Sequence, residues 1–458
     1  MPAHTVSSPQ RIAVVGAGIA GLASAWLLSR HHRVTLFEAE PRLGGHSNTV
    51  DVTVDGHTHP VDTGFLVFND RTYPNLIALF AHLGVPSVPT EMTFAVSLNQ
   101  PNLEWAGSTL ATVFGQKRNL VSPAFWGMLR DILRFNREST AWLAAHAQGQ
   151  SSGGMSLRQF LDAGRYSTAF RDWYLLPMAA AIWSCPTAQM QDMPLAPFVR
   201  FCVNHGLLQI FDRPQWRTVQ GGSREYVRRI ADQLDDIRTG SPVRAVQRLA
   251  AESGAAPRVR LLLDSGPEDF DQVVMACHSD QSLEILGDTA SPGQREVLAA
   301  VRYQPNRAVL HTDPALLPRD RRLWSAWNYL ADSPARAGQA DASVGVSYLI
   351  NRLQPLPFST PVVVTLNPPR PVAQEHIHAQ FDYAHPVFDA AAVAAQQRLP
   401  QVQGEGGIWL AGAWGRYGFH EDGLMSALAV ARGFGIEPPW SASSVSVTPA
   451  PAPEAVSA

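Results

Sequence analysis

Three glycines and a glutamate near the start of the chain have the spacing of a nucleotide-binding turn. Gly16, Gly18 and Gly21 directly follow the apolar run at residues 12–15, and Glu38 ends a second apolar run. In such a turn the first glycine permits the tight bend, the second lets the backbone approach a pyrophosphate, and the third lets a helix pack against the strand. An acidic residue at the tip of the next strand suits the ribose hydroxyls. The pattern predicts a dinucleotide site.

The elements that position these residues can be predicted from the surrounding sequence. Residues 12–15 and 34–37 are apolar enough for parallel strands that are buried on both faces. The segment between them predicts a helix over 19–29, whose free N–H groups and positive dipole end point at the phosphates. Ala20, in its first turn, is a predicted cofactor contact. NAD and FAD share this arrangement, so other residues must distinguish them.

The residues after Glu38 favour a flavin. Arg42, Gly44 and Gly45 complete an E-x-x-x-R-x-G-G pattern that resembles the flavin-containing amine oxidase and phytoene desaturase superfamily. The resemblance implies that the arginine and the paired glycines lie along FAD. His46, the next residue, is expected to border the cofactor.

Two further segments are similar to this superfamily in the same order. Residues 61–65 resemble its D-x-G segment, which implies flavin contacts by Thr63, Gly64 and Phe65. The strand at 408–411 ends at Gly412 and precedes an apolar helix, predicted over 424–434. This resembles the closing FAD motif, in which a helix N-terminus points at the flavin. The implied contacts are Gly412, Glu421, Asp422 and Leu424.

The middle of the chain adds a third match. Residues 221–234 resemble the glycine pair and helix of the superfamily, and the strand around Val243 would place backbone near the adenine. Residues 213–224, 181–184, 277–280 and 418–423 also resemble a bacterial subfamily of predicted NAD/FAD-binding proteins, over about residues 11–435. Members are linked with cyclopropane-fatty-acid-synthase-like methyltransferases, and some are implicated in oxidising methylated acyl chains toward furan fatty acids.

The predicted fold class is α/β: a Rossmann-like FAD-binding domain assembled from separated segments, with an inserted α+β substrate domain. The predicted boundaries are 1–10, disordered leader; 11–100, 202–300 and 395–436, FAD-binding domain; 101–201 and 301–394, substrate domain; and 441–458, disordered tail.

Two residues near the predicted flavin are candidate proton acceptors. His420 and Tyr417 flank the turn before the last helix, and imidazole titrates near neutral pH. The alternative is that both only shape the turn and cap the helix. Many amine oxidases of the superfamily hold a lysine near the flavin, but Lys117 is the only lysine here and falls in the inserted domain. This departure disfavours that mechanism.

Composition limits the remaining classes. A formal net charge of -3 predicts no general attraction to nucleic acid, and three cysteines without metal spacing predict reduced thiols in a cytoplasmic protein. His57 and His59 lack a third ligand nearby, so no metal site is predicted. The segment 120–146 mixes aromatic and basic residues. It fits either an amphipathic helix on a lipid surface, peripheral to the inner membrane, or a core helix with a solvated basic face, which we favour.

These observations predict an FAD-dependent oxidoreductase of the desaturase or dehydrogenase type that oxidises an apolar small molecule or lipid. Methylated acyl chains of phospholipids are the substrate that the subfamily resemblance implies. Two alternatives stay open: a flavin amine oxidase, and a non-catalytic flavin-binding partner of a lipid methyltransferase.

Overall fold

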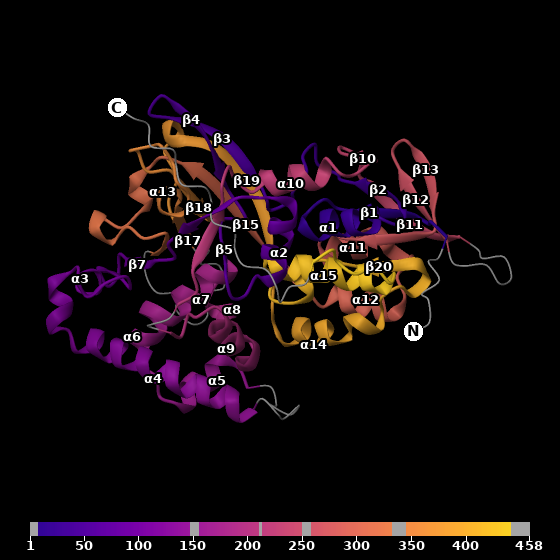
Figure 1. The fold of residues 1–458 in the computed structure, drawn as a ribbon. Coiled ribbons are helices and arrows are strands. Elements are labelled where there is room, and N and C mark those ends of the chain that lie inside the picture. Colours follow the sequence, from indigo (N-terminus) through magenta and orange to yellow (C-terminus); the bar gives the residue numbers. More distant parts are fainter. Residues whose placement is uncertain (1–7, 147–154, 210–212, 250–257, 332–344, 441–458) are drawn as a thin grey trace.

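The computed structural model describes residues 8–146, 155–209, 213–249, 258–331 and 345–440, arranged in two lobes (Figure 1). Most of the predicted leader, residues 1–7, and the predicted tail, residues 441–458, lie outside the described residues. One lobe is built on a parallel sheet and the other on a mixed sheet with a helical layer beneath it.

The parallel sheet collects strands from four distant parts of the chain. Its order is β10-β2-β1-β14-β20, and every neighbouring pair is parallel. The strands are β1 (Arg11–Val15), β2 (Arg33–Phe37), β10 (Ile237–Arg238), β14 (Gln272–Met275) and β20 (Ile408–Leu410). The predicted Rossmann-like assembly from separated segments is therefore confirmed.

Both faces of this sheet are covered, as the continuous apolar strands require. Ile12 and Val14 face one apolar cluster, while Ala13 and Val15 face another. The first cluster contains α1 (Ile19–Leu28), α2 (Pro74–Leu83), α10 (Arg224–Ala231) and α15 (His420–Gly433). The second contains residues of α11 (Ser279–Leu286), α12 (Pro292–Ala299), α14 (Ala390–Arg398) and a small antiparallel sheet, β11 (Val243–Leu249), β12 (Arg258–Leu263) and β13 (Gly266–Phe270).

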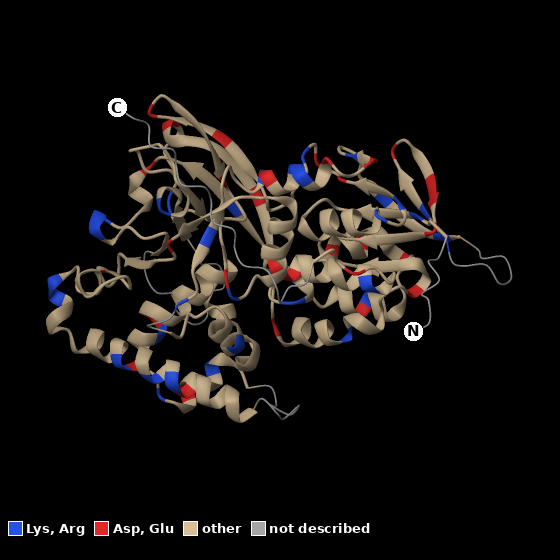
Figure 2. Ribbon diagram, in the orientation of Figure 1, with Lys and Arg blue, Asp and Glu red and all other residues tan. Residues whose placement is uncertain are grey.

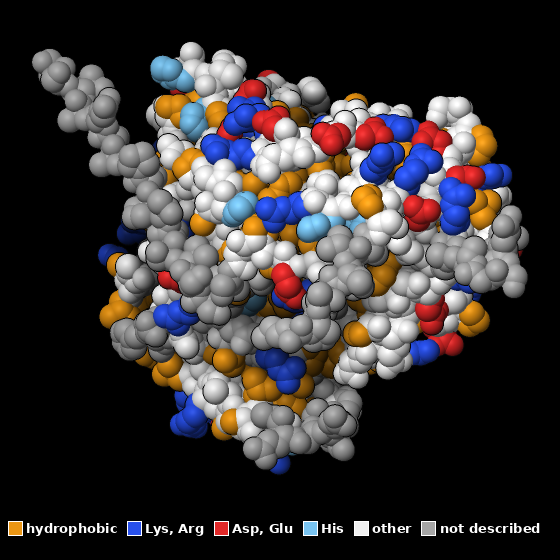
Figure 3. All heavy atoms as spheres, turned by 45° about the vertical axis from the view of Figure 1, so that its right-hand side comes forward, with side chains coloured by type: hydrophobic (Ala, Val, Ile, Leu, Met, Phe, Trp, Pro, Cys, Tyr) orange, Lys and Arg blue, Asp and Glu red, His pale blue; other side chains and the backbone are white. Residues whose placement is uncertain are grey.

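Strand β12 shows why an apolar run alone does not identify the sheet. Residues 259–263 form a strand, but it pairs antiparallel with β11 and β13 and lies outside the parallel sheet. A turn of two residues joins β12 to β13, with Gly266 at φ +117° beginning the second strand. So short a connection can only join antiparallel neighbours. Ion pairs such as Arg244–Asp264 and Arg260–Asp269 lie on the surface of the β11–β12–β13 sheet. Figure 3 shows acidic and basic side chains interspersed there.

The mixed sheet has the order β19-β15-β18-β17-β16-β7-β8. Its strands are β7 (Phe94–Leu98), β8 (Leu103–Ala106), β15 (Arg302–His311), β16 (Trp327–Ala331), β17 (Gly345–Leu349), β18 (Val363–Leu366) and β19 (Ile377–Val387). Strand β7 falls within the segment 11–100, which the sequence analysis gave to the FAD-binding domain. It pairs instead with β8 and β16 of this sheet, because a tight hairpin ties it to β8.

The structure also contains two small antiparallel sheets, built from residues 49–90 and 216–219. One pairs β3 with β4, and the other has the order β5-β9-β6. These strands are β3 (Thr49–Val54), β4 (His57–Asp62), β5 (Phe68–Asn69), β6 (Ser87–Thr90) and β9 (Trp216–Val219).

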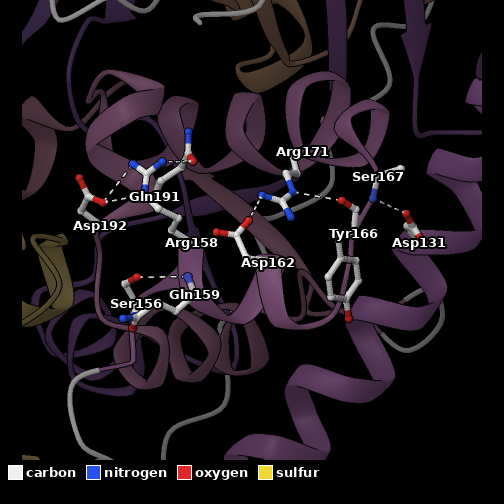
Figure 4. A network of polar contacts seen from close by, with 10 residues as sticks. All are labelled: Asp131, Ser156, Arg158, Gln159, Asp162, Tyr166, Ser167, Arg171, Gln191 and Asp192. Carbon is white, nitrogen blue, oxygen red and sulfur yellow. Dashed lines mark hydrogen bonds and ion pairs between the residues drawn. The ribbon is translucent and has the colours of Figure 1, made fainter. Parts of the chain in front are cut away.

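The helical layer packs on the mixed sheet through one large apolar cluster. It comprises α3 (Leu110–Val113), η1 (Lys117–Val121), α4 (Pro123–His146), α5 (Leu157–Ala163), α6 (Thr168–Phe170), η2 (Arg171–Leu175), α7 (Leu176–Trp183), α8 (Thr187–Gln191) and α9 (Leu195–Asn204). Polar contacts join its short helices (Figure 4). The buried Asp131 carboxylate of α4 accepts from the Ser167 N–H at 2.9 Å, and Arg171 pairs with Asp162 at 2.5 Å. The first contact ties α4 to the start of α6, and the second joins η2 to α5.

Candidate cofactor and active site

The glycine-rich turn after β1 has the geometry that the sequence predicted. The Gly16 N–H donates to the Phe37 carbonyl at 2.8 Å, which binds the turn to the end of β2. The Glu38 carboxylate accepts from the Ala17 N–H at 2.7 Å and from the Glu40 N–H at 2.9 Å. Glu38 therefore lies at the tip of β2 beside the turn, where a ribose contact was predicted, and also orders both loops.

Gly21 and Gly18 differ in what surrounds them. A Cβ atom on Gly21 would lie 1.7 Å from the Gly16 carbonyl oxygen, so the close approach of helix and turn requires glycine. A Cβ atom on Gly18 would meet no atom of the protein within 4 Å. The φ angle of Gly18, -70°, also suits any residue, so the protein itself does not require glycine there. The open space beside Gly18 is bordered by Gly45, whose own Cβ would lie 3.1 Å from the Gly18 Cα. This cradle fits a pyrophosphate.

Two helices begin at this cradle. A Cβ atom on Gly423 of α15 would lie 2.7 Å from the Ile19 side chain and 3.9 Å from the Ala20 nitrogen of α1. Gly18 caps α1 without a side-chain hydrogen bond. Ala20 and Leu424 are buried in the same apolar cluster. The positive ends of two helix dipoles therefore meet at one place, which favours an anionic ligand.

Helix α15 begins at His420, four residues before the predicted start at 424. The earlier start follows from capping, because the Asp422 carboxylate accepts from the Phe419 N–H at 3.0 Å. Arg416 pairs with Asp422 at 3.3 Å, and burial raises the pKa of Asp422 to about 6. Glu421 accepts from the Asn75 and Leu76 N–H groups at 3.0 and 2.9 Å and so caps α2. A cofactor contact by these two carboxylates stays a prediction.

His46 borders the cradle within a half-buried group of aromatic rings. It stacks on Tyr383 with ring centres 4.9 Å apart and lies 5.2 Å from His385. Burial and neighbouring histidines hold the pKa of His46 well below its usual range. Its Nε2 atom is buried and has no hydrogen-bond partner among the described residues. An orphaned polar atom beside the Gly44–Gly45 loop fits a site that a polar ligand completes.

The segment after β4 joins this group. Thr63 shares a hydrogen bond with the Tyr383 hydroxyl at 2.9 Å, and the Phe65 N–H donates to the His46 carbonyl at 2.8 Å. A Cβ atom on Gly64 would lie 2.2 Å from that same carbonyl oxygen. Arg42 donates to the Gly45 carbonyl at 2.8 Å. The predicted residues of 42–46 and 63–65 thus lie together.

The Nε2 atom of His420 points toward hydroxyl groups of neighbouring side chains. Nε2 lies 2.8 Å from the Ser47 hydroxyl and 3.1 Å from the Tyr226 hydroxyl, and the ring stacks on Phe65 at 3.7 Å. Burial lowers the pKa of His420 to about 3, so the imidazole is neutral. These contacts join the start of α15 to Ser47 and Tyr226, and a catalytic role of His420 stays a prediction. The other candidate, Tyr417, packs on Phe201 of α9 with ring centres 5.9 Å apart.

Val243 and Gly412 border the site from its outer ends. Val243 packs in a cluster with Phe37, and the Ser241 N–H donates to the Glu38 carbonyl at 2.9 Å. The Gly412 N–H donates to the Ser426 hydroxyl at 2.8 Å, which ties the end of β20 to α15.

Asp62 is the acidic residue of the D-x-G resemblance, but sequence reasoning did not predict that its side chain is the most connected one of the site. Its buried carboxylate accepts from the Ser223 N–H and hydroxyl, from the Thr49 hydroxyl at 2.6 Å and from the Gln354 amide at 3.1 Å. Burial is the largest influence on its pKa and raises it to about 6. Tyr226 and Tyr383 were also missed. Tyr226 follows the predicted glycine pair by four positions, whereas nothing in the sequence signalled Tyr383.

No group of three or more His, Cys, Asp or Glu side chains among the described residues could hold a metal ion. None of the described helices is long and apolar enough to cross a membrane.

Comparison with known proteins places this architecture in a family. Residues 19–313 match the model of the flavin-containing amine oxidoreductases. A Mycobacterium tuberculosis protein described as a flavin-containing monoamine oxidase is 28% identical over 298 residues, 63% of this chain and 61% of the relative. The chain thus spans about three fifths of that relative. The carotenoid phi-ring synthase of Chlorobaculum tepidum is 40% identical over 86 residues, 19% of this chain and 13% of the synthase.

Solved structures share the fold over nearly the whole chain. Cyclohexylamine oxidase from Brevibacterium oxydans superposes with a TM-score of 0.64 at 15% identity, over 93% of this chain and 98% of the oxidase. A fatty acid isomerase from P. acnes superposes with a TM-score of 0.64 at 16% identity, over 93% and 99%. The predicted fold and flavin cofactor, FAD, are confirmed, and the chain belongs to the flavin-containing amine oxidoreductase family.

The open space at Gly18 gives a direct test of the cofactor site. Gly18→Ala is expected to leave the melting temperature of the cofactor-free protein unchanged, since the added methyl group meets no protein atom. It should weaken FAD binding by about tenfold or more, because that methyl group occupies the path of the pyrophosphate. FAD titration by fluorescence quenching measures this effect. Gly127→Ala, also free of contacts, is the matched control. Equal FAD affinity in Gly18→Ala and wild type would contradict this placement.

Asp62 predicts a pH dependence of stability. Its folded pKa of about 6 lies above the ordinary 3.8, so the folded state binds the proton more tightly. The carboxyl group therefore stabilises most below pH 4 and loses this contribution as pH rises toward 7, by roughly 3 kcal/mol. Asp62→Asn removes the titration. The free energy of unfolding of wild type, relative to Asp62→Asn, should fall between about pH 4 and 7 in urea titrations. A rise would show that the four donors stabilise the ionised form.

Proposed function

We propose that this chain is an FAD-dependent oxidoreductase of the desaturase or dehydrogenase type, acting on an apolar substrate. The supporting observation is a cluster of aromatic rings where the helical layer meets the turn before α15. We call this cluster, formed by Trp183, Phe201, His205 and Phe419, the aromatic wall. Phe419 stacks on Phe201 with ring centres 4.9 Å apart and planes 17° apart, and Trp183 lies 4.7 Å from Phe201. His205 stacks on the same ring, and burial lowers its pKa to about 4. The wall is thus aromatic and uncharged at neutral pH.

The residues of the chain divide the work of such a reaction. The Gly16–Gly21 turn, the Gly44–Gly45 loop and the start of α15 would hold FAD, with Glu38 toward the ribose. When bound, the flavin supplies a hydride acceptor for a C–H bond. The aromatic wall would hold the substrate and exclude water, which suits an apolar molecule. The Ser47–His420–Tyr226 contacts would keep α15 in register with the cradle.

The position of the lysine supports a desaturase type over a lysine-dependent amine oxidase. Lys117, the only lysine, is exposed in η1, between α3 and α4 at the left edge of Figure 1, whereas α15 is central. The similarity to a carotenoid phi-ring synthase also favours an apolar substrate. Within this class, methylated acyl chains of phospholipids are the substrate that we propose, on the resemblance of residues 213–224 and 418–423 to the methyltransferase-linked subfamily.

Anaerobic reduction of the bound flavin tests the proposal. The holoprotein is mixed with phospholipids bearing methylated acyl chains, with matched unmethylated phospholipids, with carotenoids and with amines, and its visible absorbance is followed. Bleaching by an apolar compound, faster for the methylated lipid than for its unmethylated match, is the expected result. Bleaching by amines alone would instead assign an amine oxidase. If no compound bleaches the flavin while dithionite still reduces it, the result would favour a non-catalytic, flavin-binding accessory subunit.

The neutral histidines predict the pH profile of flavin reduction. His420 and His205 have pKa values of about 3 and 4, so neither changes charge between pH 5 and 8. The rate of flavin reduction by the bleaching substrate should stay within about twofold over that range. His420→Asn should keep the flat profile. A limb near pH 6.5 in wild type that is lost in His420→Asn would identify His420 as a proton acceptor and contradict its positioning role.

A further inference from the structure

The outer edge of the helical layer carries an unusual surface. Every large hydrophobic side chain that the described residues leave exposed lies between positions 110 and 133. These side chains, with their exposed fractions, are Leu110 (79%), Leu120 (50%), Val121 (82%), Trp126 (51%) and Leu133 (57%). Together with Lys117, Arg118, Arg130 and Arg137 they form what we call the α3–α4 patch. Exposed apolar side chains gathered in one segment mark an interaction surface.

Helical geometry places the two kinds of side chain on one stripe of α4. Trp126, Arg130, Leu133 and Arg137 follow a spacing of four, three and four residues, so they share one face of the helix. The opposite face is the packed one, with Phe125, Met128 and Phe135 fully buried in the apolar cluster. The stripe therefore faces away from the protein. Helix α4 runs along the lower edge of the molecule in Figure 1.

The charge of this patch is predominantly positive. Residues 110–138 contain five basic residues and two acidic ones, of which Asp131 is buried and Glu138 is partly exposed. Arg130 and Arg137 are 79% and 78% exposed, and each pairs only with the carboxylate next in sequence, Asp131 at 3.9 Å and Glu138 at 3.7 Å. Such exposed pairs leave both guanidinium groups open to solvent. Figure 2 shows blue positions along α4 and at its α3 end.

Arg134 is the exception among the arginines of α4, because its side chain packs against the protein. Its guanidinium lies over the Tyr166 ring at 4.0 Å and pairs with Asp131 at 3.3 Å, with 28% of its side chain exposed. It belongs to the packing of α4 and not to the patch. The favoured interpretation from the sequence, a core helix with a solvated basic face, is thus incomplete, because the outward face also presents Trp126 and Leu133.

We propose that the α3–α4 patch docks this protein on an anionic lipid bilayer. A helix that lies on a membrane combines buried aromatic and aliphatic side chains with lysine and arginine at the head groups. Each basic residue near an anionic surface strengthens binding, and tryptophan prefers the interfacial region. The outward stripe of α4 presents aliphatic, indole and cationic groups together, which is the combination that a lipid surface binds. This inference is independent of the substrate proposed above.

Vesicle sedimentation tests the docking. The holoprotein is spun with vesicles of phosphatidylglycerol and phosphatidylethanolamine, and with phosphatidylcholine alone. Wild type should bind the anionic vesicles and release them at high salt. Arg130→Glu with Arg137→Glu should weaken binding by about tenfold or more, as should Trp126→Ala with Leu133→Ala. Arg244→Glu with Arg432→Glu carries the same charge change on the other lobe and should bind within about twofold of wild type.

Three results would overturn the proposal. Wild type that stays in the supernatant with anionic vesicles has no lipid docking surface. Equal loss in the patch and control variants would assign binding to net charge. A concentration-dependent dimer that Trp126→Ala with Leu133→Ala abolishes, without vesicle binding by wild type, would assign the patch to a second copy of the chain. Near-ultraviolet circular dichroism and flavin content of each variant confirm that it is folded.

Discussion

One buried carboxylate connects the parts from which the site is built. Asp62 ends β4, and its oxygens accept from Thr49 of β3, from Ser223 at the start of α10 and from Gln354 beyond α13 (Ile350–Leu353). These partners lie up to 292 residues away in sequence. The strand that carries Thr63, Gly64 and Phe65 toward the cradle is thereby fixed against both lobes. A carboxyl group in so apolar a place is tolerated because its acceptor positions are satisfied by donors.

Around this anchor, the site uses backbone groups as well as side chains to attract a ligand. Two helices start in contact at Ile19 and Gly423, and the nearby acidic side chains are already engaged within the protein. The histidines beside them are neutral. The fixed dipoles of the helices therefore add to the positive potential of the Arg42 guanidinium, which donates to the Gly45 carbonyl beside the cradle. The dipole contribution does not vary with pH or with side-chain motion.

The sequence predicted those features that depend on local pattern. Each strand of the parallel sheet except β10 coincides with an apolar run in the sequence. The glycine spacing after β1 identified the turn, because backbone sterics allow few residues there. Features that depend on tertiary contact were not predictable. The partners of His420 lie 373 and 194 residues away, so its low pKa could not be inferred from neighbours in sequence. Helix α15 begins four residues before the apolar run at 424, because the Asp422 carboxylate accepts from the Phe419 N–H and adds a first turn.

The capping of α2 by Glu421 has a mechanical consequence. The first N–H groups of one helix are held by a side chain from the first turn of another, far along the chain. A rotation of α15 that moved its start would uncap α2 and expose unpaired amides to an apolar cluster. The starts of α2 and α15 are therefore coupled, so a displacement of one start disturbs the capping of the other.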